Sequence, residues 1–267
     1  MFAEYFLPID ESELDRLDLN HYKYYVTLGG KYFLAPIAND VQAVLDIGTG
    51  TGIWALDFAD KYPSARVIGI DIAVTQPEWV APNCAFHISD AELDWTFKLN
   101  YFDYIHLRDM GHAIHNWKKI VQQCFNHAKP GGWVEFGGVL PEPRSDDNTL
   151  DPKSTYKALG DAWVEIDRNI ECDPDSAKIF KALFLQQGFK QIKKTVFKIP
   201  SSPWPKDQLL KEIGAIELVH TCDTDIEGTI IKEWTKKLRR PLEGLKSLIR
   251  EERNEMRSSK VHSYLEL

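Results

Sequence analysis

Three glycines in the segment VLDIGTGTGIW, residues 44–54, form the pattern in this sequence that is most indicative of chemistry. An apolar run precedes Gly48, Gly50 and Gly52, and a stretch with helical spacing follows from Ile53. Glycine allows the backbone angles of a tight turn and lets a ligand approach bare backbone, and N–H groups at the start of a helix attract an anion. The segment therefore predicts a strand, a ligand-binding loop and a helix that hold a nucleotide-like molecule.

Carboxylates farther along the chain indicate the kind of nucleotide. A dinucleotide-binding loop needs glycine at the position of Ile53, and the chain has no GK[ST] sequence that would form a P-loop. Asp71 ends the next apolar run, 19 residues after Gly52, where an acid can accept hydrogen bonds from both ribose hydroxyls. Asp90 and Ala91 follow the third run, where a carboxylate can meet an adenine amino group. Together these positions predict an adenosine that carries no pyrophosphate.

The elements that must position these residues alternate regularly along the chain. Short apolar runs separated by helix-length segments are typical of βαβ units, so we expect an α/β fold with a Rossmann-like, mostly parallel sheet. The expected strands are residues 43–48, 65–72, 84–89, 102–107, 132–140 and 193–200, and helical spacing covers 156–170, 176–187 and much of 208–257. The expected segments are an N-terminal helical flap (1–40), a core (41–200), a late helical lid or substrate cap (201–260) and a short terminal strand of the core (261–267).

Composition narrows the class of protein. The 267 residues include 32 Lys and Arg against 40 Asp and Glu, a formal charge of −8, which argues against a nucleic-acid partner. The four cysteines form no CxxC pair, so they are expected to be reduced thiols rather than zinc ligands or disulfides. Because the chain starts without a signal-peptide pattern and has no long apolar run, we expect a cytoplasmic enzyme with no membrane contact.

One stretch departs from this acidic balance. Residues 231–260 carry ten basic and five acidic side chains, a local charge of +5. A solvated helix face is the simpler interpretation, and a surface for a protein partner is the alternative.

The ordered motifs of the chain resemble the class I S-adenosylmethionine-dependent methyltransferases, and within them the fungal group related to the secondary-metabolism regulator LaeA. The resemblance rests on DRLDLNHYKYYVTLGGKYFLAPI, VLDIGTGTGIWALDFADKYP, VIGIDIAVTQPEWV, NCAFHISDAELDWTF, FDYIHLRDM, KPGGWVEF, KIPSSPWPKDQLLKEIG and the terminal HSYLEL. It implies S-adenosylmethionine as the cofactor and a seven-stranded sheet. It also implies contacts of Asp46, Gly48, Gly50 and Gly52 with the methionyl end, of Asp71 with the ribose, of Asp90 and Ala91 with the adenine, and a place beside the cofactor for Arg108; Thr49 and Ile72 complete the expected cofactor-binding set.

Histidines after the fourth expected strand are the candidates for catalysis. The sulfonium methyl is already activated, so transfer mainly needs alignment, but a hydroxyl acceptor must also lose its proton to a base. His115-Asn116-Trp117 resembles the H-[DN]-W element of plant and fungal O-methyltransferases, whose histidine is the base. We expect His115, and after it His112, to be catalytic. The alternatives are that both lie on a helix surface or pair with carboxylates; a metal site is the weakest option, and we expect no metal.

The remaining candidates concern the substrate. The expected contacts are Tyr25 in the flap, Met110 after the fourth strand and Trp204 at the mouth of the lid, although Trp204 between two prolines also suits a rigid loop anchor. His106 alternates with Tyr104 along its strand, which favours a buried, hydrogen-bonded position in the core.

These features predict an enzyme that transfers a methyl group to a hydroxyl, or another heteroatom, of a small fungal secondary metabolite of aromatic or polyketide-like character. The methyl group would move by in-line displacement. One alternative is a LaeA-type regulatory protein that acts through protein partners, and another is a pericyclase or cyclase built on the same fold.

Overall fold

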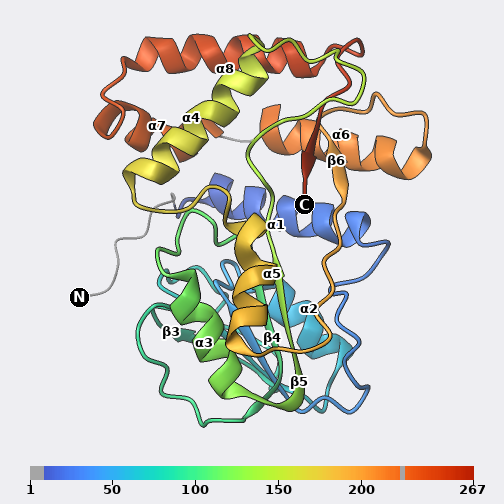
Figure 1. Ribbon diagram of the computed structural model, residues 1–267, viewed down its shortest axis with the longest axis vertical. Helices are drawn as coiled ribbons and strands as arrows, with labels where there is room; N and C mark the ends of the chain where they lie inside the picture. Colours follow the sequence, from blue (N-terminus) through green and yellow to red (C-terminus); the bar gives the residue numbers. More distant parts are fainter. Residues whose placement is uncertain (1–8, 223–225) are drawn as a thin grey trace. The chain divides into compact units, whose positions relative to one another are not determined.

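The computed structural model describes residues 9–222 and 226–267, which form two compact units (Figure 1). The first unit contains Gly30–Gly138 and Ser176–Lys194, and the second contains Asp10–Gly29, Val139–Asp175 and Thr195–Leu267. Residues 1–8 of the expected flap and residues 223–225 of the expected lid lie outside the described residues. No helix in the described ranges is both long enough and apolar enough to span a bilayer.

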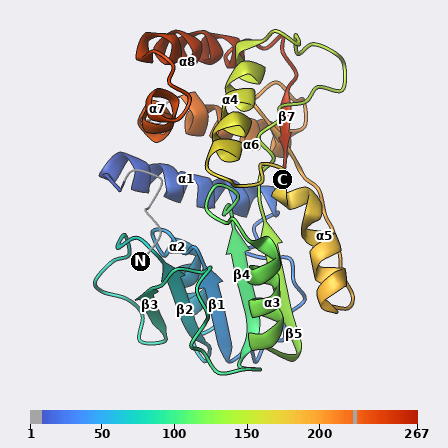
Figure 2. The ribbon, with the colours of Figure 1, turned by 60° about the vertical axis from the view of Figure 1, so that its left-hand side comes forward.

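The first unit is built on a parallel sheet of five strands in its described part. The strands are β1 (Ala43–Ile47), β2 (Arg66–Asp71), β3 (Cys84–Ile88), β4 (Phe102–Arg108) and β5 (Ala128–Gly137), in the order β3-β2-β1-β4-β5 (Figure 2). Every residue of β1 is buried, as expected of a central parallel strand covered on both faces. The strand order reverses between β1 and β4, so their carboxyl ends form the switch point at which open α/β sheets bind ligands.

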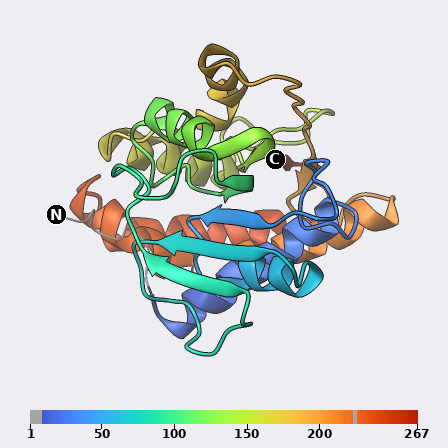
Figure 3. The same cartoon turned by 90° about the horizontal axis from the view of Figure 1, so that it is seen from below.

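Helices cover both faces of this sheet. Figure 3 shows α2 (Ile53–Lys61) and α3 (Trp117–His127) on opposite sides of the strands. Helix α5 (Ser176–Gln187) packs against α3. Side chains alternate between the two faces, because successive residues of a strand point in opposite directions. Val44 and Tyr104 pack with Trp54 of α2, whereas Leu45 packs on the α3 side. The same alternation puts Asp46 and His106, two residues after Val44 and Tyr104, on the α2 face.

The second unit is mainly helical. It contains α1 (Glu11–Thr27), α4 (Thr155–Asn169), α6 (Gln208–Cys222), α7 (Ile226–Lys236) and α8 (Leu242–Met256), with the short strands β6 (Lys198–Pro200) and β7 (Tyr264–Glu266). Helix α1 packs against α6, and α8 packs against α4 and α7. Asp10 begins α1 as an N-cap, since its carboxylate accepts the Glu13 N–H at 3.0 Å.

The expected parallel core is confirmed, but the expected seven strands are wrong. The strand predicted at 193–200 shortens to Lys198–Pro200 and pairs antiparallel with β7 in a separate two-stranded sheet. Both the predicted and the observed strand end at Pro200, so the shortening removes residues 193–197, of which Phe197 still exchanges backbone hydrogen bonds with Leu267 at 2.9 and 3.0 Å. The terminal residues Tyr264–Glu266 therefore extend β6 and not the five-stranded sheet.

A buried ion pair joins α1 to α6. Lys23 Nζ lies 2.7 Å from Glu217 Oε2, and each side chain is 4% exposed. Thr221 donates its hydroxyl to the other oxygen of Glu217 at 3.2 Å. Because a buried charge is tolerated only when it is paired and hydrogen-bonded, these contacts fix the position of α1 along α6.

Removal of one member of this pair is expected to be costly. Lys23→Ala leaves the Glu217 carboxylate buried without its cation, so the free energy of unfolding should fall by about 3–5 kcal/mol. Lys129→Ala is the matched control, because Lys129 pairs with Asp103 at 2.7 Å with 38% and 28% of the side chains exposed, and such a pair contributes about 1 kcal/mol or less. Urea denaturation followed by circular dichroism compares the two variants; equal losses would show that burial does not set the energy of the Lys23–Glu217 pair.

Candidate functional site

The loop between β1 and α2 takes the conformation that its glycines predict. Gly48, Gly50 and Gly52 have φ angles of 67°, 57° and 83°, in the left-handed region that side chains with a Cβ disfavour. The Ile70 carbonyl accepts the backbone N–H groups of Gly48 and Thr49 at 2.9 and 3.0 Å. No side chain caps the N-terminus of α2, which begins after Gly52. The loop therefore presents bare backbone next to a helix N-terminus.

Neighbouring side chains lie directly against the loop. A Cβ placed on Gly52 would come within 2.4 Å of the Phe86 ring, and one on Gly48 within 2.1 Å of the Met110 sulfur. On β2, a Cβ at Gly69 would meet Phe86 and the Thr49 hydroxyl, both at 2.7 Å. Crowding therefore favours glycine at all three positions, and at Gly48 and Gly52 the positive φ angles favour it as well. Met110, a predicted substrate contact, covers the first glycine of the loop.

A buried carboxylate holds the beginning of the loop. Asp46, 3% exposed, accepts the Thr49 hydroxyl at 2.6 Å through Oδ2 and lies 2.7 Å from His106 Nδ1 through Oδ1. His106 is 4% exposed, so the expected core position is confirmed. The Trp54 ring stacks on the imidazole with centroids 3.8 Å apart and an angle of 4°, and its Nε1 donates to the Tyr32 carbonyl at 2.8 Å.

Asp71 holds the middle of the loop from the end of β2. Its Oδ2 accepts the Gly50 N–H at 2.8 Å and its Oδ1 accepts the Ala73 N–H at 3.0 Å. Burial raises the pKa of this carboxyl above its ordinary value, although the N–H groups of Ala73, Gly50 and Ile72 oppose the rise, and the charge of Asp46 adds to it. Backbone donors thus aim a carboxylate at the loop, where its remaining lone pairs can accept hydroxyl groups.

Two residues missed at the sequence level hold the other side of Gly50. Its carbonyl accepts the Thr75 hydroxyl and the Gln76 side-chain amide, each at 2.7 Å. Both residues follow β2 in a segment without regular structure, and their spacing in the sequence does not predict the contact with Gly50. Both backbone groups of Gly50 are therefore fixed by side chains from the β2 end of the sheet.

The predicted adenine-binding residues adjoin the predicted base. Asp90 accepts the Glu92 N–H at 2.8 Å, and the Ala91 carbonyl accepts side-chain N–H groups from Trp95 and Gln123 at 3.0 Å. Glu92 accepts the backbone N–H of Asn116 at 2.7 Å, and its Oε2 lies 2.7 Å from His115 Nδ1. The pairing of His115 with a carboxylate, raised as an alternative above, is present.

The Glu92 contact determines which nitrogen of His115 is available. A carboxylate is only an acceptor, so Nδ1 carries a proton and Nε2 is the nitrogen left to exchange a proton with a substrate. The His115 side chain is 49% exposed, and Asn116 caps α3 by accepting the Lys119 N–H at 3.0 Å. This is an oriented imidazole with one open nitrogen, the arrangement that a general base requires.

The other predicted residues are distributed over both units. Arg108 ends β4, and His112 lies in the turn that follows it. Trp204 belongs to the second unit, where its ring stacks on His262 at 4.7 Å and its Nε1 donates to the Ser263 carbonyl at 3.0 Å, consistent with a loop anchor. Tyr25 packs in the apolar cluster around Ile199 of the same unit. The roles of these four residues stay predictions.

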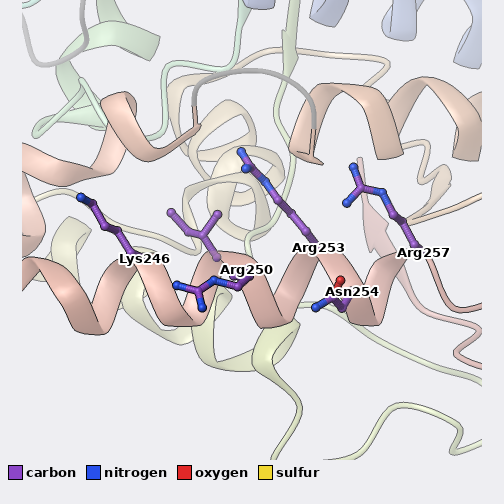
Figure 4. Close-up of a pocket in the computed structure, with 6 residues that line it drawn as sticks. Lys246, Arg250, Arg253, Asn254 and Arg257 are labelled. Atoms are coloured by element: carbon purple, nitrogen blue, oxygen red, sulfur yellow. The ribbon is translucent and has the colours of Figure 1, made fainter.

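A hollow lies along α8. A cavity of about 300 Å³ is lined by Lys246, Ile249, Arg250, Arg253, Asn254 and Arg257. The five side chains labelled in Figure 4 all come from this one helix, and four of them are cationic. Four of the ten basic residues of 231–260 line this hollow, and α8 also carries the acidic residues Glu243, Glu251, Glu252 and Glu255.

Comparisons with known proteins agree with this arrangement. A family model described as a methyltransferase domain matches residues 19–194. Methyltransferase pytC of Aspergillus terreus is 39% identical over 219 residues, which cover 82% of this chain and 67% of that protein. Protein-methionine methyltransferase laeA of Emericella nidulans is 32% identical over 266 residues, which cover 97% of this chain and 70% of that protein.

A solved structure confirms the fold. Phosphoethanolamine N-methyltransferase 2 of Haemonchus contortus, in complex with phosphomonomethylethanolamine and S-adenosylhomocysteine, superposes with a TM-score of 0.50 at 17% identity, covering 99% of this chain and 60% of that chain. The same enzyme in complex with S-adenosyl-L-methionine also gives 0.50.

The crowding at Gly52 is open to a direct test. Gly52→Ala adds a strained φ and a clash with Phe86, so it should lower the free energy of unfolding by about 2–4 kcal/mol. Gly131→Ala is the matched control: Gly131 has nearly the same φ, 85° against 83°, but nothing lies within 4 Å of an added Cβ, so only the cost of the backbone angle, about 1 kcal/mol, is expected. Chemical denaturation measures both, and losses of the same size would mean that Phe86 yields to the new methyl group.

Proposed function

This chain belongs to the class I S-adenosylmethionine-dependent methyltransferases, in the fungal LaeA-like group, and from that membership we propose that it methylates a hydroxyl group of a small secondary metabolite with His115 as general base. One observation carries the choice of a hydroxyl acceptor. It is the Glu92–His115 pair, in which Glu92, directly after the Asp90–Ala91 turn in the sequence, orients the imidazole through Nδ1.

The residues at the carboxyl edge of the sheet fit this cofactor. The glycine loop offers bare backbone, the uncapped N-terminus of α2 suits the methionyl carboxylate, and the Asp71 carboxylate suits the ribose hydroxyls. We assign the adenine to the Asp90–Ala91 turn. Arg108, the last residue of β4, and Met110, two residues later, are assigned to contacts near the methionyl group of the cofactor.

The protein has three tasks in the reaction. When bound, the cofactor supplies an activated methyl group on a positively charged sulfur. The chain must align the acceptor with that methyl, which can account for about 7–11 kcal/mol of the barrier. His115 Nε2 takes the hydroxyl proton as the new bond forms, and Glu92 stabilises the imidazolium through Nδ1. The substrate contacts are proposed to come from Trp204 and Tyr25.

A second candidate acceptor follows from the relatives. One of them is named a protein-methionine methyltransferase, and a thioether sulfur has no proton to lose. An enzyme of that kind has no need of a base, and it requires a surface that recognises a protein. The cavity along α8 is the observation that favours it, because the four cationic side chains that line the cavity complement an acidic partner.

The fate of the methyl group separates the two candidates. With radiolabelled S-adenosylmethionine and an extract of the source fungus, we expect label in the organic-soluble fraction, and His115→Ala should reduce that labelling by about 10²–10⁴-fold because the base is gone. Glu92→Gln should give a smaller loss. His87→Ala, which changes an exposed histidine on β3, is the control. If the label instead appears in precipitated protein and His115→Ala does not reduce it, the hydroxyl acceptor is wrong and a thioether acceptor is supported.

The raised pKa of Asp71 predicts a pH dependence of cofactor binding. Protonation of Asp71 converts an acceptor of ribose hydroxyls into a donor. Because the pKa of Asp71 is raised in the folded protein, the affinity for S-adenosylhomocysteine should fall on acidification at a higher pH than an ordinary aspartate would produce. Asp71→Ala should weaken S-adenosylhomocysteine binding by roughly 10- to 100-fold, since hydrogen bonds to a charged group contribute about 1.5–3 kcal/mol. Calorimetry between about pH 8 and pH 5 measures both effects. Asp60→Asn, on the exposed side of α2, is the control; an unchanged affinity of Asp71→Ala would remove the ribose assignment.

A further inference from the structure

Two arms of the cofactor-binding loop meet at one buried imidazole. The first arm is tied through the Thr49 hydroxyl to Asp46, and Asp46 is tied to His106. The second arm continues into α2, and Trp54 of this helix stacks on the face of the His106 imidazole. Asp46 and His106 stand opposite each other in the register of β1 and β4. Few alternatives remain for the path of the loop once these contacts form.

We propose that His106 is a positioning residue for cofactor binding, which acts through Asp46 and Thr49 to fix the loop at 48–52. The inference rests on the proposed function, because it assumes that this loop holds the cofactor. It also changes the role expected of Asp46. Both of its oxygens are engaged inside the protein and the residue is 3% exposed, so its effect on the cofactor passes through Thr49.

The chemistry of the pair specifies the proton. Asp46 as a carboxylate only accepts hydrogen bonds, so His106 Nδ1 and the Thr49 hydroxyl must both donate to it. A buried carboxylate deprived of one donor seeks another partner or draws in water, and either response moves the strand end from which the loop departs. The Thr49 hydroxyl is the part of the loop that such a movement reaches first.

Hydrogen bonds distinguish the Trp54–His106–Asp46 arrangement from simple core packing. Trp54 fills space on the α2 face, but its indole N–H is also committed to the Tyr32 carbonyl, so the plane on which the imidazole stacks is itself fixed. The imidazole is therefore held by a stacked ring and a carboxylate at once. Its position is determined well enough to set that of Asp46, which is what a positioning residue must do.

The test compares two substitutions of His106 that differ in one donor. In His106→Asn the amide nitrogen replaces Nδ1 and can still donate to Asp46, whereas His106→Leu keeps the bulk and removes the donor. Calorimetric titration with S-adenosylhomocysteine should give a dissociation constant within about threefold of wild type for His106→Asn and at least about 30-fold weaker for His106→Leu. A purely structural role would lower the stability of both variants and the fraction of active protein, but not the affinity of the folded fraction.

A second variant keeps the inference testable if His106→Leu fails to fold. Thr49→Val removes only the hydroxyl, and we expect about tenfold weaker binding and faster hydrogen exchange of the Gly52 amide, which is bonded to the Thr49 carbonyl at 2.9 Å. The double variant Thr49→Val with His106→Asn should bind S-adenosylhomocysteine with a dissociation constant within about threefold of that of Thr49→Val alone. The two effects should not add, because both changes act through Asp46. Wild-type affinity in Thr49→Val, or equal affinities in His106→Asn and His106→Leu, would overturn the inference. Failure of the wild-type protein to bind S-adenosylhomocysteine would instead contradict the proposed function.

Discussion

A carboxylate buried near the end of β1 is the constraint on which the first unit depends. Burial of a charge is unfavourable unless each oxygen finds a donor, and Asp46 finds them in the loop that follows its own strand and in the neighbouring strand β4. These two bonds link the sequence-local turn at Thr49 to the sheet partner His106. Strand register, loop path and the placement of α2 through Trp54 are thereby fixed together and not one at a time.

The same loop is also fixed by what surrounds Gly50. Its N–H donates to Asp71, and its carbonyl receives Thr75 and Gln76, so both groups of one peptide unit are aligned before any ligand arrives. Phe86 closes the remaining side against Gly52. A site prepared in this way loses little conformational entropy on binding, which would favour the affinity of the proposed cofactor.

The sequence was a good guide where local periodicity decides structure. The strand, loop and helix at 44–54 and the helix at 176–187 follow directly from apolar spacing and glycine positions. It was a poor guide to contacts between distant residues: Glu92 meets His115, and Lys23 meets Glu217, only because the topology brings them together. The predicted number of strands is wrong for a related reason. Residues 193–200 form one of the short apolar runs, but the pairing partner of Lys198–Pro200 is β7 and not a strand of the core sheet. Thr75 and Gln76 carry no local signal at all.

This difference explains why the cofactor can be inferred from the sequence more readily than the acceptor. The loop that we propose for the cofactor offers mainly backbone groups, so its requirements appear in the sequence as glycines and as acidic residues at strand ends, in a fixed order. Recognition of an acceptor depends instead on side chains that differ in kind from one reaction to another: a hydroxyl requires a base such as His115, whereas a thioether requires none. A histidine whose Nδ1 is held by Glu92 can accept a proton only where the acceptor has one to lose, and that chemical asymmetry, rather than overall likeness to any relative, is the basis on which we propose a hydroxyl acceptor.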